Sequence, residues 1–396
     1  MSNKVAILGA SGFVGSTLFE YLREDPSFEV VPFSHSTGGA ACLAHQGLIF
    51  EQLDVLDAKA VERALKPFDY IVNCSRGGPD VMLGGLNNLL AAAAKSPSLK
   101  KFVHLSSVAI YGDPPSPQSV REDAPTVPAA EEGYGPIKAL QDERVAAAAN
   151  RGVRSVVLCP PNIIGPYSPY LMSLISTIEG GRFRLVDDGR HVVSTVDVTN
   201  LCAGIRAAMV SDVHDGRRLF VCDAERTTWA DLYQALKPIL RGAPDAPSIT
   251  ETEFREIHAR EQAASAPADV ARSALRHLVS DEVREVLRLN PRWARVEGAA
   301  KDLVRMFGDK AEGYMRGVTG GIIKVPTTYP ADGQDSRLIA QQLRKVYHDP
   351  ARGLKELDYT LPYSFDQSMK AFCDWYTTVF EGNTPEWQLL VESARS

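Results

Sequence analysis

The chain has 396 residues, of which 44% are hydrophobic and 23% charged, and 43 basic against 49 acidic residues give a net charge of -6. This length is enough for one large domain with a sizeable core plus a smaller lobe. The acidic balance argues against a nucleic-acid partner, because such proteins gather basic charge on one face. The six cysteines lack the close Cys or Cys/His spacing of a zinc site, so we expect reduced thiols and no metal.

The amino terminus passes from Met1 directly into a strand-like run, without the apolar segment and cleavage site of a secretion signal. No stretch approaches the roughly 18 uninterrupted apolar residues that cross a bilayer. The sequence therefore predicts a cytoplasmic protein with no membrane partner.

Apolar runs alternate with helical patterns through the first 160 residues. The runs predicted as strands are Val5 to Leu8, Glu29 to Phe33, Tyr70 to Asn73, Phe102 to Leu105 and Ser155 to Leu158. Their nearly continuous apolar character is typical of parallel strands that helices cover on both faces. The prediction is an α/β fold, a Rossmann-type doubly wound parallel sheet over residues 1–159, with crossover elements from 190–225. Ligands should bind at the carboxyl ends of its strands.

Residues 160–396 are predicted to form a smaller substrate-binding lobe. It contains a strand-like run at Leu219 to Cys222, a helix that Thr227 or Thr228 caps, and an aromatic helix from Phe365 to Phe380 that packs back on the lobe. A helical insertion is expected at about 241–325, because apolar residues repeat at helical spacing there. Its interspersed acids and bases favour a solvated face over a dedicated partner surface.

Glycines punctuate the turn between the first strand and the first helix. Gly9, Gly12 and Gly15 have the spacing Gly-x-x-Gly-x-x-Gly. Their missing side chains would let a pyrophosphate approach backbone N–H groups at the positive end of the helix. A tight turn without a ligand is the alternative, but the strand before and the helix after favour a phosphate site.

Tyr134 and Lys138 lie four residues apart, downstream of Ser107. On a helix this spacing places the phenol and the ammonium on one face, where the positive charge should lower the ordinary phenol pKa of about 10. A tyrosine tuned in this way can exchange a proton with a substrate. The pair alone could be an ordinary surface pair, but its order after the glycine motif and Ser107 indicates dinucleotide redox chemistry.

The glycine motif, Ser107, Tyr134 and Lys138 together resemble the extended short-chain dehydrogenase/reductase group, the NAD-dependent epimerase/dehydratase family. The resemblance covers about residues 1–240 and resumes near 347–376. It implies a Rossmann domain with bound NAD or NADP, a substrate lobe, often a nucleotide-sugar substrate, and a homodimer. It also implies that Tyr134 is the acid/base, that Lys138 binds the nicotinamide ribose, and that Ser107 binds substrate.

The same resemblance implies two wider sets of residues. The cofactor set is Gly9, Ser11, Gly12, Phe13, Val14, Gly15, Ser34, His35, Asp54, Val55, Asn73, Cys74, Ser75, Tyr134, Lys138 and Pro161, and the substrate set is Ser107, Val108 and Asn162. Asp54 would contact adenine, the alternative being a plain loop before a helix that Asp57 caps. No acid ends the second strand, so the choice between NAD and NADP stays open.

The expected reaction is hydride transfer at a secondary alcohol or ketone, by an epimerase or by a reductase. A ketoreductase or dehydrogenase acting on a non-nucleotide small molecule is the alternative, because Cys159 stands where the family commonly has an arginine and a second-lobe arginine is missing. A catalytically silent dinucleotide sensor is the rival from another class.

Overall fold

The computed structural model describes residues 2–35, 50–112, 115, 121–127, 133–240, 245–264 and 336–378. The chain divides into two compact units, one of residues 1–250 with 334–396 and one of residues 251–333. The first unit contains the sheet and all of the predicted site residues.

A seven-stranded sheet, parallel throughout, forms the centre of the first unit. In sheet order its strands are β10 (Asp215–Phe220), β6 (Ser155–Cys159), β5 (Lys101–Leu105), β4 (Tyr70–Asn73), β1 (Asn3–Leu8), β2 (Phe28–Ser34) and β3 (Glu51–Gln52). The Rossmann-type sheet and its five predicted strands are confirmed. The strand predicted at Leu219 to Cys222 is observed as β10, which begins and ends earlier, at Asp215 and Phe220. The strand order reverses between β1 and β4, and such a reversal opens the crevice where α/β proteins bind ligands.

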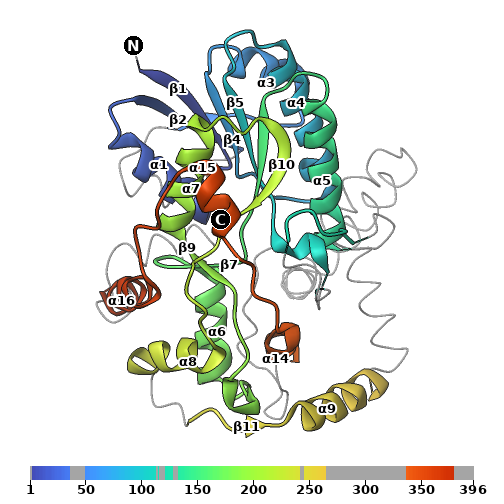
Figure 1. Ribbon diagram of the computed structural model, residues 1–396, viewed down its shortest axis with the longest axis vertical. Coiled ribbons are helices and arrows are strands. Elements are labelled where there is room, and N and C mark those ends of the chain that lie inside the picture. The colour runs from blue at the N-terminus through green and yellow to red at the C-terminus, as the bar shows by residue number, and fades with distance from the viewer. Residues whose placement is uncertain are drawn as a thin grey trace, which may run out of the picture. The chain divides into compact units, whose positions relative to one another are not determined.

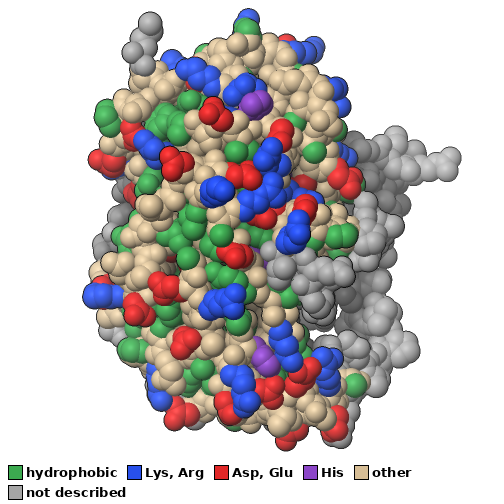
Figure 2. Space-filling model, viewed as in Figure 1, with side chains coloured by type: hydrophobic (Ala, Val, Ile, Leu, Met, Phe, Trp, Pro, Cys, Tyr) green, Lys and Arg blue, Asp and Glu red, His purple; other side chains and the backbone are tan. Residues whose placement is uncertain are grey.

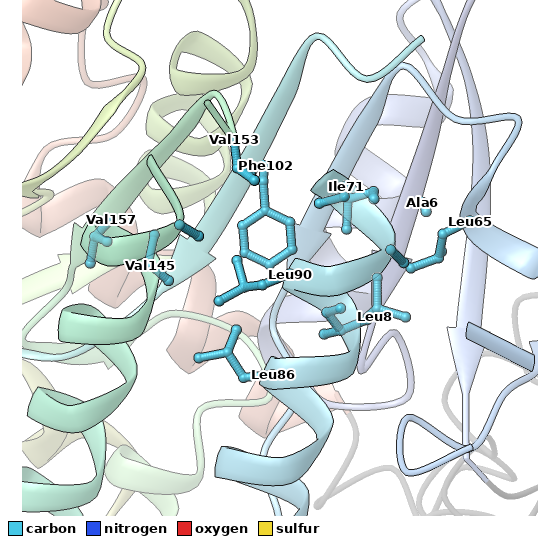
Figure 3. Packing of buried hydrophobic residues seen from close by; sticks show 14 of the residues in the cluster. Ala6, Leu8, Leu65, Ile71, Leu86, Leu90, Phe102, Val145, Val153 and Val157 are labelled. Carbon is cyan, nitrogen blue, oxygen red and sulfur yellow. The ribbon is translucent and has the colours of Figure 1, made fainter. Parts of the chain in front are cut away.

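Helices cover both faces of the sheet (Figure 1). The helices are α1 (Phe13–Arg23) and α7 (Val198–Val210) on one face, and α3 (Ala58–Leu65), α4 (Leu86–Lys95) and α5 (Tyr134–Ala149) on the other. Successive strand residues point to opposite faces, so Leu8 joins the core under α4 while Ile7 joins the core under α1. Figure 3 shows the first of these cores, in which Phe102 of β5 lies beside Leu90 of α4. This two-sided burial explains why the strands read as continuous apolar runs.

A second, smaller lobe is built from segments that lie before and after β10 in the chain. Its elements are β7 (Asn162–Ile164), α6 (Pro169–Glu179), β8 (Leu185–Val186), β9 (Thr195–Asp197), α8 (Trp229–Leu236), β11 (Ser248–Ile249), α14 (Ser336–Gln341) and α16 (Phe365–Tyr376). The helix α15 (Ala351–Leu357) instead packs against α7 and against β10 of the sheet. Thr228 caps α8 in a reciprocal capping box with Asp231. Phe372 and Tyr376 of α16 belong to the same buried cluster as Leu174 of α6, and α16 packs against α8 of the lobe, as the aromatic pattern predicts.

Of the predicted insertion, the structure describes residues 245–264, in which α9 (Glu251–Ala264) is helical. The apolar repeats expected in the rest of that segment lie outside the described residues, as does one of the six cysteines, Cys42. The five described cysteines are free thiols.

No helix in the described ranges combines the length and the apolar character that crossing a membrane requires. Acidic and basic side chains are interspersed over the face that Figure 2 presents. A mixed surface of this kind lacks the single-sign field that attracts a phosphate backbone.

Candidate active site

The glycine turn lies at the carboxyl end of β1, against the end of β4. Gly9 has a φ of +77°, and a Cβ on it would lie 2.8 Å from the Cα of Ser75. A Cβ on Gly15 would lie 2.3 Å from the carbonyl oxygen of Gly9. Only glycine therefore allows the loop to close this tightly.

The same turn leaves the amino end of α1 open to an anion. Gly12 is the residue before α1, no side chain caps the helix, and the first turn contains no acidic residue. Helix N–H groups without such partners, at the positive end of the helix dipole, suit a phosphate group. The residues present thus fit a dinucleotide: Ser11 lies in the turn itself, and Phe13 and Val14 are the first residues of α1.

At the end of β2, a serine hydroxyl stands where dinucleotide-binding folds usually carry an acidic residue. Ser34 is buried and its hydroxyl donates to the hydroxyl of Ser11 over 3.1 Å, while His35 is exposed. Farther along, Asp54 is exposed and accepts a hydrogen bond from the backbone N–H of Leu56 over 2.9 Å. Asp57 caps α3, as the alternative interpretation of this segment expected. The adenine contact of Asp54 and Val55 stays a prediction.

A buried hydrogen-bond network fixes the end of β4. The Asn73 side-chain oxygen accepts from the backbone N–H of Ser75 over 3.1 Å and from its hydroxyl over 2.5 Å. The Asn73 amide nitrogen lies 3.2 Å from Nδ1 of His104, which burial keeps neutral by lowering its pKa. Burial raises the pKa of the neighbouring Cys74 thiol to about 12, so this thiol is not a nucleophile near neutral pH.

Ser107, Tyr134 and Lys138 gather at the carboxyl end of β5. Ser107 precedes a 3-10 turn and its hydroxyl accepts from the N–H of Ala109 over 3.2 Å. Tyr134 is the first residue of α5 and is 39% exposed, whereas Lys138 is buried one turn later. The Lys138 ammonium donates to the carbonyl of Leu105 over 2.8 Å. The predicted helix placement of the pair is confirmed.

The pKa of the Tyr134 phenol is raised, not lowered as its spacing from Lys138 predicts. Burial raises the pKa of Tyr134 above its ordinary value, and the opposing positive charge is that of Arg76, assisted by the hydroxyl of Ser107. The guanidinium of Arg76 lies over the Tyr134 ring, 5.0 Å from the ring centre. Burial also lowers the pKa of Lys138 to about 8, so the ammonium itself is poorly stabilised.

One cavity of about 190 Å³ lies beside Ser107 and Tyr134. Ser107, Val108, Tyr134, Pro161 and Asn162 all line it, which brings the predicted substrate residues together. Among the described residues, Lys138, the glycine turn, His35, Asp54 and Val55 are absent from its wall.

The far wall consists of residues that the sequence did not single out, namely Val192, Val193, Ser194, Trp229, Gln341, Arg344, Val346 and His348. The Ser194 hydroxyl donates to the carbonyl of Val346, which ties two distant segments together. Burial lowers the pKa of His348 to about 4, so its ring is neutral near pH 7. No local motif marks these positions, because folding alone brings residues 341–348 against 192–194.

Two relatives bear on the function. A ketoreductase of Stigmatella aurantiaca, 4-hydroxy-2-methyl-3-oxo-4-farnesyl-3,4-dihydroquinoline-1-oxide ketoreductase, is 35% identical over 118 residues, which are 30% of this chain and 35% of that enzyme. The chain therefore spans about a third of the ketoreductase's length. A UDP-glucose 4-epimerase of Mycolicibacterium smegmatis is 27% identical over 352 residues, which are 78% of this chain and 100% of the epimerase.

Solved structures support the fold. The crystal structure of UDP-glucuronic acid 4-epimerase from Bacillus cereus in complex with NAD superposes with a TM-score of 0.61 at 15% identity, covering 95% of this chain and 99% of that one. Residues 5–222, more than half of the chain, match the sequence model described as the NAD dependent epimerase/dehydratase family. With its Rossmann sheet and its glycine turn, the chain therefore belongs to the NAD-dependent epimerase/dehydratase family of enzymes.

Proposed function

We propose that this protein transfers hydride at a secondary alcohol or ketone with NAD or NADP, and that its substrate is a nucleotide-activated sugar. The observation that carries the proposal is the shared cavity, which Ser107, Tyr134 and Asn162 all line. A proton donor, a second hydroxyl and a polar substrate contact at one cavity are the parts that carbonyl redox chemistry needs.

The dinucleotide would lie across the carboxyl ends of β1, β2 and β4. The pyrophosphate would meet the uncapped amino end of α1, and Ser34 and His35 would face the adenosine ribose. Asn73, Cys74 and Ser75 would line the cofactor at β4, with Tyr134, Lys138 and Pro161 at its nicotinamide end. When bound, the nicotinamide ring of the cofactor would accept or donate the hydride.

The chain's own residues manage the proton. The Tyr134 phenol would give its proton to, or take it from, the substrate oxygen, while the Ser107 hydroxyl orients that oxygen. Lys138 is held by the Leu105 carbonyl and would bind the nicotinamide ribose. Asn162 and Val108 would position the substrate at the cavity wall.

The support for a nucleotide sugar comes from relatives that include a UDP-glucose 4-epimerase matched over its whole length. Epimerisation and net reduction differ in the fate of the cofactor. An epimerase retains and recycles NAD, whereas a reductase releases the cofactor at each turnover. Extraction of tightly held NAD from the purified protein would support epimerisation, and an empty site with NADPH-dependent turnover would contradict it.

A second candidate is a ketoreductase or dehydrogenase of a non-nucleotide small molecule. The cavity of about 190 Å³ is smaller than the roughly 300 to 1,000 Å³ of typical ligand pockets, and Val192, Val193 and Trp229 give it an apolar wall. The Stigmatella relative is named as a ketoreductase. Uridine diphosphate, added while the cofactor site is saturated with NAD or NADP, separates the two candidates, because only a nucleotide-sugar enzyme should gain further thermal stability from it.

Turnover of a panel of nucleotide sugars and ketones by wild type and Tyr134→Phe tests the proposal. The phenylalanine variant should lose at least about a hundredfold in kcat, because general acid-base groups contribute about 10²–10⁴-fold. Tyr363→Phe is the matched control, since Tyr363 is also exposed and does not line the cavity. Equal rates for wild type and Tyr134→Phe would overturn the catalytic assignment, and cofactor binding without turnover of any substrate would favour a sensor.

A further inference from the structure

The charge that faces the phenol of Tyr134 comes from a different element than the sequence indicates. Arg76 follows β4, and its guanidinium carbon lies 5.0 Å from the centre of the Tyr134 ring. Lys138, one turn along α5 from Tyr134, instead donates to the Leu105 carbonyl. We propose that Arg76 is a positioning residue whose positive charge stabilises the ionised form of Tyr134, an inference that rests on the proposed role of this phenol.

Geometry gives Arg76 this role. A cation over an aromatic face within about 6 Å is attracted by the ring, and the attraction grows when the oxygen carries negative charge. Arg76 is exposed, and within the described ranges its recorded interactions are the ring contact and a charge repulsion with the Lys138 ammonium. Its replacement should therefore leave the fold intact.

The other groups facing the phenol do not supply this charge. Ser107, from the end of β5, is neutral and contributes a hydrogen bond. Asp142 on α5 and Cys159 on β6 disfavour the phenolate, and burial does so most strongly. The amino end of α5 adds a partial positive charge at Tyr134, its first residue. Among these groups, Arg76 carries a full positive charge, and this charge opposes the rise in the Tyr134 pKa that burial causes.

The placement has a chemical consequence. Because the phenol is partly desolvated, its ionised form needs a nearby cation to be reached during proton transfer. An exposed guanidinium can do this without a buried ion pair and its desolvation cost. Its effect should weaken as salt screens the exposed charge.

Titration of Tyr134 in the full-length protein, without cofactor or substrate, tests the inference. Tyrosine labelled with ¹³C at Cζ reports ionisation by NMR, and Tyr134→Phe identifies the signal. Arg76→Met should shift the Tyr134 midpoint upward by about half a pH unit, which reduces the ionised fraction at about pH 10 by up to about threefold. Arg76→Lys should restore most of that fraction, since it keeps the charge.

Two controls make the result decisive. Arg23→Met removes an exposed arginine that pairs with Glu24, and it should leave the Tyr134 signal unchanged. Added salt should lower the ionised fraction in wild type but not in Arg76→Met. An unchanged midpoint in Arg76→Met, or equal shifts in the methionine and lysine variants, would overturn the inference. Because titration needs no turnover, this failure is distinguishable from failure of the Tyr134→Phe activity test.

Discussion

Asp142 of α5 should make the stability of this protein depend on pH in a defined way. Its side chain is 5% exposed. Burial raises the pKa of Asp142 from 3.8 to about 7, although the Ser106 hydroxyl and the charges of Arg218 and Lys138 oppose that rise. The folded protein therefore holds a proton on Asp142 that the unfolded chain releases three pH units lower.

The sign follows from proton linkage. Below pH 3.8 both states hold the proton, so Asp142 contributes no pH dependence. Between 3.8 and about 7 the folded state binds more protons, so the free energy of unfolding falls as pH rises. Since one pKa unit corresponds to about 1.4 kcal/mol, the accumulated loss is about 4 kcal/mol above pH 7.

Asp142→Asn removes the titration and keeps the shape of the side chain. We expect its advantage in unfolding free energy over wild type to grow from near zero at about pH 4 to about 4 kcal/mol at about pH 8. Urea denaturation at a series of pH values measures this difference. Asp80→Asn is the matched control, because Asp80 is exposed, and its difference from wild type should stay flat. A flat difference for Asp142→Asn as well would refute the reasoning.

Three further predictions follow from packing and capping. Gly15→Ala should weaken NAD binding at least about tenfold by titration calorimetry, since its Cβ would meet the Gly9 carbonyl at 2.3 Å and the loop must open; unchanged affinity would contradict the phosphate site. Phe102→Ala should cost about 3–5 kcal/mol in urea unfolding, because the ring is fully buried beside Leu90, and a loss under about 1 kcal/mol would show that the core collapses around the gap. Thr228→Ala should cost about 1 kcal/mol in the same assay, through loss of the α8 capping box; an unchanged midpoint would mean that water replaces the cap.

Much of the fold can be predicted from the sequence, because it depends on local residue patterns. The five predicted strands are apolar on both faces, and the glycine turn lies between a strand and a helix whatever the later course of the chain. The placement of Tyr134 and Lys138 one turn apart on the same helix also follows from their four-residue spacing alone. These features depend on residues a few positions apart, so the sequence predicts them.

The electrostatics and the cavity depended on contacts between distant segments. The sequence predicts Lys138 as the positive charge beside the Tyr134 phenol. In the structure the Lys138 ammonium donates to the Leu105 carbonyl, and Arg76, which follows β4, lies over the Tyr134 ring. The wall at residues 341–348 likewise meets residues 192–194 only after folding. Helical and strand patterns fix which residues share a face of one element. The burial of a site and the charge around it depend on every element that packs there, so only the tertiary structure determines them.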